Sequence, residues 1–465
     1  VVFRSLSRSN STDRASASHW GVVAEIDRFF GVQDSGSTIA TELRGGLTTF
    51  VTMAYIVVVN ADLLSKAGIP IESAIFATCA SSAIGTFLMA WWAGYPFALA
   101  PGMGLNAYFV FSVVPAVAAA LGPGPPDRAW KVALGLVGWS GGLFLIATWL
   151  EVRSRIMREI PMTLKLAVSA GIGLFIAFIG MQGAGAVVAD PRTLVKLGDV
   201  HAPSVWIAGA GLLVTAGLWT RRIPGALLIG ILATTALAMV LGHADGPERW
   251  VAFPEVSGTM FQWDLRGAFD IRFLDIMIAL LFVDFFDTMG TLVGVGVQGD
   301  FLDDNGRLPR DNRALSADAA ATVAGAALGT APVTTYVESA SGIAAGARTG
   351  LANMVVVGGF CGAMFFAPAL TAVPSFATAP VLVVVGALMA TSLSKIEWED
   401  RGEGIAAFVT ALGIPVTFSI ADGMAMGVAV YLGSKALGGR SQEISWVMWA
   451  LGAIFVLRFL FIPLE

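Results

Sequence analysis

The chain has 465 residues, of which 56% are hydrophobic and only 13% are charged, and its mean hydropathy is +0.76. This composition excludes an ordinary soluble domain and predicts a protein that crosses a lipid bilayer many times. The net charge of −5 at pH 7 also argues against a nucleic-acid partner, because such a partner normally needs a basic protein face.

The first 41 residues precede the apolar part of the chain. Residues 1–20 are rich in Ser and Arg and contain no apolar run, so they do not resemble a secretory signal peptide. We expect a disordered tail, with a leftover targeting or expression segment as the alternative.

Apolar stretches long enough, or nearly long enough, to cross a bilayer recur along the rest of the chain. We count fourteen: 46–65, 71–94, 97–121, 130–150, 162–185, 204–219, 224–242, 273–297, 316–331, 333–346, 352–372, 376–394, 404–438 and 446–463. The stretch 404–438 could hold two short segments, because Ile420-Ala421-Asp422-Gly423 has turn chemistry. An odd total would move the C-terminus to the other side of the membrane.

Basic residues in the loops support this count, since Lys and Arg gather in cytoplasmic loops. With a cytoplasmic N-terminus, the loops after the fourth, sixth, eighth and tenth segments should be basic. They contain Arg153, Arg155 and Arg158, then Arg221 and Arg222, then Arg307, Arg310 and Arg313, and finally Arg348. The pattern predicts that both termini are cytoplasmic.

The two halves of the chain share an interrupted segment. Ala100-Pro101 and Ala331-Pro332 lie about half the chain length apart, and a polar side chain follows each pair, Asn106 in the first half and Glu338 in the second. Two interrupted spans at corresponding positions are typical of the binding site of a transporter. Around Glu338 we expect a short strand that leads into a half-helix, whose positive N-terminal end faces the site.

Carboxylates inside apolar segments are the main candidates for function, because placing one at mid-membrane costs roughly 2.5 to 3.5 kcal/mol. Asp284 and Asp287 are three residues apart, so on a helix they share one face. Glu338 is the third candidate. The alternatives are structural: either Asp could cap a broken helix, Glu338 could be an ordinary helix-start residue, and Asn106 could satisfy broken backbone.

Several other chemistries are excluded. Residues 102–107 fit a dinucleotide fingerprint, but they lie within membrane spans, where Gly102 and Gly104 more simply allow close backbone approach. Residues 300–306 lack the essential carboxylates of a calcium loop. No second motif for intramembrane aspartyl proteolysis and no hydrolase motif occurs. The histidines, His19, His201 and His243, lie in the tail, a loop and a span end, so proton coupling would need the carboxylates.

These motifs resemble those of the nucleobase transporter family of uracil, xanthine and ascorbate permeases, and specifically its adenine–guanine–hypoxanthine branch. The resemblance covers nearly the whole chain. It rests on residues 48–56, 100–109, 334–339 and 346–350, and on the segment with Asp284 and Asp287.

The resemblance implies an all-α polytopic fold of fourteen transmembrane segments in two inverted seven-span repeats, with short β-strands in the broken third and tenth spans. It implies a core domain at 42–150 and 273–372, a gate domain at 151–243 and 373–465, and an extracellular loop at 244–272. It also implies proton symport of adenine, guanine or hypoxanthine by movement of core against gate, and a homodimer formed through the gate.

The resemblance also implies which residues bind the purine. Asp287 stands where pyrimidine and xanthine relatives have a binding Glu, and Glu338 where they have a second ligand, whereas Asn106 and Asp284 are features of the purine branch. The shorter Asp at 287 leaves open which Asp contacts the base. A planar heterocycle also needs an apolar or aromatic wall, for which Phe50, Phe285 and Tyr336 are the candidates. We expect substrate binding by the set Asn106, Asp284, Asp287, Glu338, Phe50, Phe285, Tyr336, Thr335 and Gly104, and proton coupling by its three carboxylates.

Two other functions remain open at this point. One is an anion transporter or exchanger of the related sulfate-permease type, although such relatives usually have a cationic or neutral site and a soluble C-terminal domain. The other is a membrane receptor that senses a purine. We expect no catalytic activity, no metal and no cofactor, and a location in a plasma membrane or a bacterial inner membrane.

Overall fold

The computed structural model describes residues 25, 27–150, 159–303 and 308–461. Nine of the helices in these ranges are long and apolar enough to cross a membrane. The expected tail at residues 1–20, the basic cluster at Arg153, Arg155 and Arg158, and Arg307 all lie outside the described residues.

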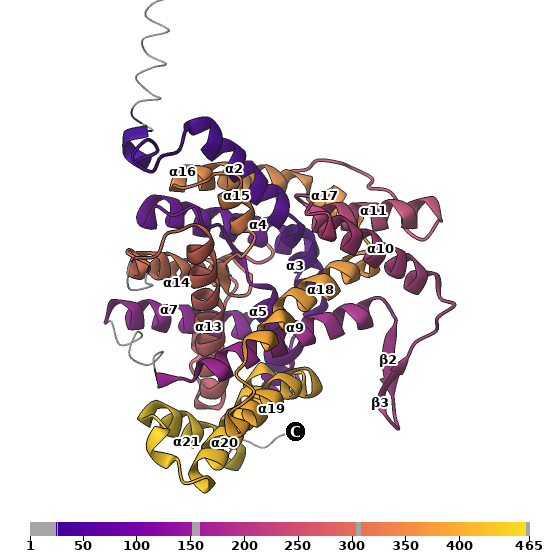
Figure 1. The fold of residues 1–465 in the computed structure, drawn as a ribbon. Coiled ribbons are helices and arrows are strands. Elements are labelled where there is room, and N and C mark those ends of the chain that lie inside the picture. Colours follow the sequence, from indigo (N-terminus) through magenta and orange to yellow (C-terminus); the bar gives the residue numbers. More distant parts are fainter. Residues whose placement is uncertain (1–24, 26, 151–158, 304–307, 462–465) are drawn as a thin grey trace, which may run out of the picture.

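The first half of the chain contains helices α2 to α11 (Figure 1). Their bounds are α2 Ile39–Met53, α3 Tyr55–Lys66, α4 Ile71–Leu88, α5 Met103–Tyr108, α6 Val114–Leu121, α7 Arg128–Trp149, α9 Met162–Gly183, α10 Pro203–Thr220 and α11 Ala226–Val240. A π-helical turn at Met89–Ala93 extends α4, and another at Phe109–Val113 joins α5 to α6.

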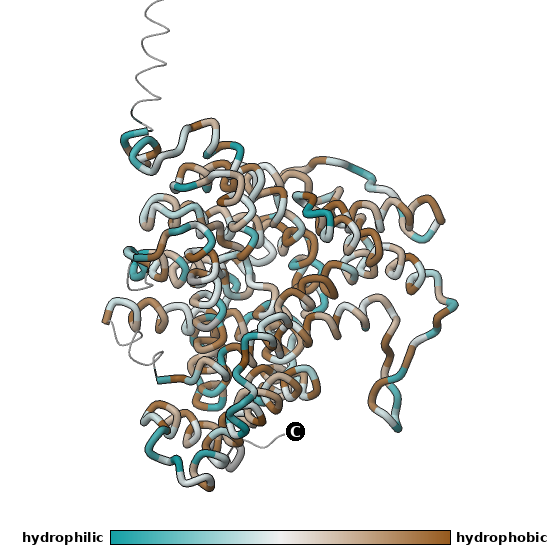
Figure 2. The backbone as a smooth tube through the Cα atoms, in the orientation of Figure 1, coloured by the Kyte–Doolittle hydropathy of each residue, from teal (hydrophilic) through white to brown (hydrophobic). Residues whose placement is uncertain are grey.

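The second half contains helices α13 to α21. Their bounds are α13 Leu274–Gln298, α14 Asp311–Leu328, α15 Ser339–Ala344, α16 Gly350–Ala363, α17 Ala367–Leu370, α18 Ser375–Ala390, α19 Arg401–Thr417, α20 Ile420–Leu437 and α21 Trp446–Phe461. In Figure 2 the helices are mostly brown to white, the colours of hydrophobic and intermediate residues, and many of the teal, hydrophilic residues lie in loops.

Equivalent helices of the two halves make equivalent contacts. The equivalent pairs, first half and second half, are α2 and α13, α4 and α14, α7 and α16, α9 and α18, α10 and α19, and α11 and α20. The contact of α7 with α14 matches that of α16 with α4, and the contact of α19 with α9 matches that of α10 with α18. The contact of α11 with α2 likewise matches that of α20 with α13. α4 meets its own counterpart α14, and α9 meets its own counterpart α18. This is the contact pattern of two seven-segment repeats related by a twofold axis.

The repeat changes the segment count at the C-terminal end. Residues 404–438 form two helices, α19 and α20, with the break at Phe418 in the left-handed region (φ 54°). The expected break at Asp422 is wrong, because Ser419 caps α20 and places Asp422 in its first turn. The second repeat therefore ends with α20, and α21 is a further apolar helix. A cytoplasmic C-terminus consequently depends on whether α21 crosses the membrane.

The helices form two packing groups. One contains α2 to α7 with α13 to α17, and the other contains α9 to α11 with α18 to α20. Within the second group, α9 and α18 touch at Gly173 and Gly386. A Cβ at either position would lie within 2.6 Å of the other glycine's carbonyl oxygen, so only glycine permits this approach.

The two longer loops carry structure that the sequence did not predict. Residues 186–203 include a hairpin of β2 Val187–Asp190 and β3 Leu194–Leu197, in which Lys196 forms a 3.0 Å ion pair with Asp190. The loop 244–272 includes the short helix α12 Leu265–Ala268, which packs on α7.

A cluster of charged residues links the start of α19, the end of α20 and the turn at Ser441–Glu443 that precedes α21. The side chain of Lys435, in the last turn of α20, is only 3% exposed, and its Nζ lies 3.0 to 3.1 Å from carboxylate oxygens of Asp400, Glu403 and Glu443. Arg440 also binds Asp400 and Glu443. Hydrogen bonds from Arg440 and Lys435 hold the pKa of the Asp400 carboxyl well below its usual range.

We expect Lys435→Met to lower the thermal unfolding temperature of the purified protein, because the substitution leaves three neighbouring carboxylates without their shared cation. The loss should be about 2 kcal/mol. The matched control is Lys196→Met. The Lys196 side chain is 57% exposed, so its ion pair should contribute little to the free energy of unfolding. Equal unfolding temperatures for the two variants would contradict this role.

The same cluster predicts how stability depends on pH. Because the folded-state pKa of Asp400 is lowered, its contribution is present above the unfolded-state value of about 3.9 and is lost as the pH falls below it. We expect the wild type to lose stability more steeply than Asp400→Asn between pH 5 and 3, measured by thermal unfolding at each pH.

Candidate functional site

Two three-residue strands meet and pair within the first packing group, at a place that we call the strand crossing. β1 Leu99–Pro101 pairs antiparallel with β4 Val333–Thr335, with Ala100 opposite Thr334. The Gly102 N–H donates to Pro332 O at 3.0 Å, and the Tyr336 N–H donates to Ala98 O at 2.9 Å, which lengthens the ladder at both ends. The prediction of short strands in both interrupted segments is confirmed.

Each strand leads into a half-helix, β1 into α5 and β4 into α15. The first N–H groups of a helix have no intrahelical acceptor, and its N-terminus carries a partial positive charge. Both helix starts therefore bring donors and positive potential to the crossing. Glu338 occupies the N-cap position of α15, one residue before the predicted first turn.

The two aspartates of α13 lie in different environments. Asp284 is fully buried, and its Oδ2 accepts a 3.2 Å hydrogen bond from Thr322 on α14. Asp287 is only half-buried and lies at the start of α5, where a Cβ added to Gly102 would be 3.4 Å from its Oδ2. Of the two, Asp287 is thus the one whose side chain is partly exposed.

Glu338 is also half-buried, and its Oε1 accepts a 2.8 Å hydrogen bond from the hydroxyl of Tyr55. Tyr55 begins α3, directly after the break at Ala54. Tyr55 was not among the residues predicted from the sequence, although it lies in the segment 48–56 that carries the family resemblance.

Asn106 and Tyr336 both hold the carbonyl of Pro101. The Asn106 Nδ2 donates to this oxygen at 3.2 Å and the Tyr336 hydroxyl donates at 2.5 Å. The Asn106 side chain therefore satisfies broken backbone, which was the structural alternative. Its Oδ1, however, is buried and has no hydrogen-bond partner among the described residues.

A fourth acidic residue, Asp318 of α14, was missed. It is fully buried, and its carboxylate accepts hydrogen bonds from Thr288 at 2.7 Å and from Thr335 at 3.2 Å. Thr288 is also 2.9 Å from Thr334, so α13, α14 and β4 share one polar cluster. An acidic residue inside the apolar stretch 316–331 was the signal that could have identified it.

The remaining predicted residues have contacts with other helices. Phe50 packs edge-to-face on Phe360 of α16, and Phe285 packs on Phe144 of α7. Gly104 lies against α9, where an added Cβ would be 2.2 Å from Ile172 Cγ2. Of the three residues expected to form aromatic walls, Tyr336 is the one placed at the strand crossing, where its hydroxyl donates to Pro101 O.

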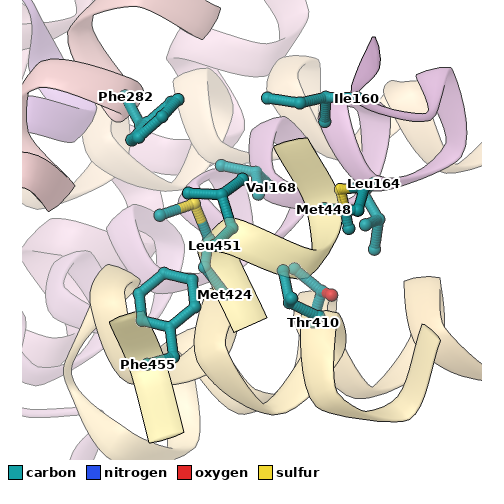
Figure 3. A pocket seen from close by; sticks show the side chains of 10 residues that line it. Ile160, Leu164, Val168, Phe282, Thr410, Met424, Met448, Leu451 and Phe455 are labelled. Atoms are coloured by element: carbon teal, nitrogen blue, oxygen red, sulfur yellow. The ribbon is translucent and has the colours of Figure 1, made fainter. Parts of the chain in front are cut away.

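A separate small pocket lies between α9, α13, α19, α20 and α21 (Figure 3). Its lining is apolar except for Thr410, whose hydroxyl already donates to Ala406 O at 2.8 Å. Figure 3 places Phe282 of α13 opposite the side chains of the other helices. With no free polar group in its lining, this pocket is unsuited to a polar ligand.

No group of three or more His, Cys, Asp or Glu side chains that could hold a metal ion occurs among the described residues. The arrangement at the strand crossing, with broken helices, half-helix N-termini and half-buried carboxylates, is that of a membrane transporter.

The chain belongs to the permease family, whose model matches residues 40–426. A putative permease of Methanocaldococcus jannaschii is 46% identical over 94% of this chain and 98% of its own length. The guanine/hypoxanthine permease PbuG of Bacillus subtilis is 42% identical over 93% of this chain and 99% of its own. The adenine permease AdeP of Escherichia coli is 37% identical over 94% and 96%.

Solved structures with the same fold include the transmembrane domain of the cyanobacterial bicarbonate transporter BicA. Its TM-score is 0.62 at 15% identity, over 85% of this chain and 96% of that one. SLC26A9 has a TM-score of 0.64 at 12% identity, over 94% and 72%. Both support a fold of two seven-span repeats.

The strand crossing predicts the effect of Gly102→Ala. The new Cβ would lie 2.6 Å from Thr334 Cγ2, on a β-branched side chain that has little freedom to move, so the two strands must separate. We expect most transport of the protein's substrate to be lost while the protein is still produced in the membrane. Gly142→Ala on α7 is the control, because nothing lies within 4 Å of its Cβ. Normal transport by Gly102→Ala would contradict the account.

Proposed function

We propose that this permease imports purine nucleobases, namely adenine, guanine or hypoxanthine, together with protons. The names of several relatives, at 36–42% identity over more than 90% of the chain, support a purine substrate. The observation that carries the mechanism is the pair of half-buried carboxylates, Asp287 and Glu338, at the starts of two half-helices.

A purine nucleobase is a planar, neutral ring system with N–H donors and ring-nitrogen acceptors. Asp287 and Glu338 would accept hydrogen bonds from its N–H groups, and the N–H groups at the starts of α5 and α15 would donate to its acceptors. Tyr55 orients Glu338 through its 2.8 Å hydrogen bond. Asn106 and Tyr336 act on the base indirectly, by fixing the Pro101 carbonyl.

Proton coupling would use the carboxylates. The described residues contain no ion pair between a Lys or Arg and Asp284, Asp287 or Glu338. A proton is therefore the simplest way to neutralise a carboxylate while the substrate moves. We assign substrate binding to Asp287 and Glu338, and a structural or proton-holding role to the buried Asp284.

The two packing groups suggest how the site changes access. We infer that α2 to α7 with α13 to α17 form the mobile core, and that α9 to α11 with α18 to α20 form the gate and the dimer interface. The contact between Gly104 and Ile172 lies at the boundary between them. The basic loops still predict a cytoplasmic N-terminus.

Anion transport is the second candidate, because the bicarbonate transporter BicA and the anion transporter family of SLC26A9 share the fold. Identities of 12–15% support the fold alone. Two carboxylates at the crossing would repel an anion unless both were protonated, so the site favours a neutral substrate. A purine-sensing receptor would bind the base without moving it.

The test is uptake of labelled hypoxanthine, adenine, guanine, uracil and sulfate into proteoliposomes, with and without an inward proton gradient. We expect at least one purine to accumulate only with the gradient. Sulfate flux without purine uptake would replace the proposal with anion transport, and purine binding without uptake would indicate a receptor.

Glu338→Gln keeps the shape of the side chain but removes its charge. Because a hydrogen bond to a charged group contributes about 1.5 to 3 kcal/mol, we expect purine uptake at low concentration to fall about 10- to 100-fold. Glu72→Gln, at an exposed position in the first turn of α4, is the matched control. Unchanged gradient-driven uptake by Glu338→Gln would remove Glu338 from the mechanism.

A further inference from the structure

A second, larger cavity lies away from the strand crossing. It has a volume of about 760 Å³, which is in the range of small-molecule sites. Its walls come from residues 29–35, from the π-helical turn after α4 and the adjoining Gly94, from the start of α14 and from the loop before α16. In Figure 1 the segment before α2 lies beside α16.

Three arginines line this cavity: Arg310 and Arg313 at the start of α14, and Arg348 before α16. The described residues contain no ion pair that involves any of them. Three guanidinium groups in one cavity without bound carboxylates form a site for a multiply charged anion, and arginine is particularly suited to phosphate.

Two of the three arginines, Arg310 and Arg348, are held by their surroundings. The guanidinium group of Arg310 lies 4.7 Å from the centre of the Tyr95 ring. The Nη1 of Arg348 donates to the carbonyls of Ile343 and Ala347, and the buried Glu42 accepts hydrogen bonds from the backbone N–H groups of Arg348 and Thr349. The cavity is therefore a built structure with ordered walls.

Aromatic rings and one carboxylate complete the lining. Trp91 is 60% exposed and Trp92 is 37% exposed; one face of Trp91 stacks on Phe87 at 6.3 Å between ring centres, and the exposed parts of the two indoles offer aromatic surface to a ligand. Asp34 lies in the same cavity and offers an acceptor for N–H groups. A simple phosphate would use only the arginines, whereas a ligand with a phosphate and an aromatic base would use all three kinds of group.

We propose that this cavity binds a nucleoside monophosphate, with its phosphate on Arg310, Arg313 and Arg348 and its base against Trp91 and Trp92. The loops with Arg310, Arg313 and Arg348 are those expected on the cytoplasmic side, where such nucleotides occur. The inference concerns a site separate from the strand crossing and does not depend on the transported substrate.

An anionic lipid headgroup shares the phosphate chemistry, and Trp and Arg are also common at membrane interfaces. Asp34 favours the nucleotide, because its carboxylate can accept hydrogen bonds from the N–H groups of a base, whereas a phosphatidylglycerol headgroup has no N–H group. The two sources can be separated in one experiment.

The experiment is calorimetric titration of the purified full-length protein with GMP, guanosine and inorganic phosphate, in detergent and in nanodiscs of neutral lipid or of lipid with added phosphatidylglycerol. We expect GMP to bind at least 10-fold more tightly than either guanosine or phosphate, and to bind equally in both kinds of nanodisc. Loss of GMP binding only in phosphatidylglycerol nanodiscs would assign the cavity to lipid and overturn the proposal.

Arg313→Gln is the first variant, because the described residues show no hydrogen bond or ion pair of its side chain, so the fold should not depend on it. It should weaken GMP binding at least 10-fold. Trp91→Ala should weaken the binding of GMP but not of phosphate. Arg249→Gln, at an exposed arginine outside the cavity, is the control. GMP affinity that is the same in wild type, Arg313→Gln and Trp91→Ala would overturn the proposal.

Discussion

The pairing of two three-residue strands, β1 and β4, is the interaction on which the rest of the site depends. Each strand interrupts a membrane segment, and an interrupted segment inside a bilayer leaves backbone groups that must find partners within the protein. By pairing with its own counterpart, each strand supplies those partners to the other. The half-helices α5 and α15 can then begin inside the interrupted segments, with both N-termini at the strand crossing.

The side chains around the crossing complete this task. Asn106 and Tyr336 hold the Pro101 carbonyl, and Thr322 donates to Val333 O and accepts from the Val333 N–H. Thr86 does the same for Leu99 in the other strand. Polar residues in these segments thus bond mainly to the backbone, which leaves Asp287 and Glu338 as the partly exposed carboxylates near the strand crossing.

The sequence predicted the strands, the half-helices and the polar positions, because an Ala-Pro pair in an apolar segment is a strong local signal that recurs in both halves. It could not separate the roles of Asp284 and Asp287, since helical spacing puts them on one face, and only the packing of α14 buries one of them. It missed Asp318, which lies in a segment without other unusual features.

The end of the second repeat was misjudged for a different reason. Turn residues at 420–423 suggested a break there, but Ser419 caps α20 and turns Asp422 into a helix-start residue, so the chain breaks at Phe418. A cap and a turn use the same residue types, and local sequence alone does not distinguish them. Phe50 and Phe285 were predicted because a planar base needs an aromatic wall, whereas their packing partners, Phe360 and Phe144, come from helices distant in the sequence.

The central claim is that a purine and a proton move together through a site whose carboxylates include Asp287 and Glu338. The most direct measurement is the internal pH of proteoliposomes after a purine is added outside, with no imposed pH gradient. The account predicts internal acidification with the wild type, and none with Asp287→Asn or Glu338→Gln. Purine entry without acidification, or acidification that persists in both variants, would contradict it.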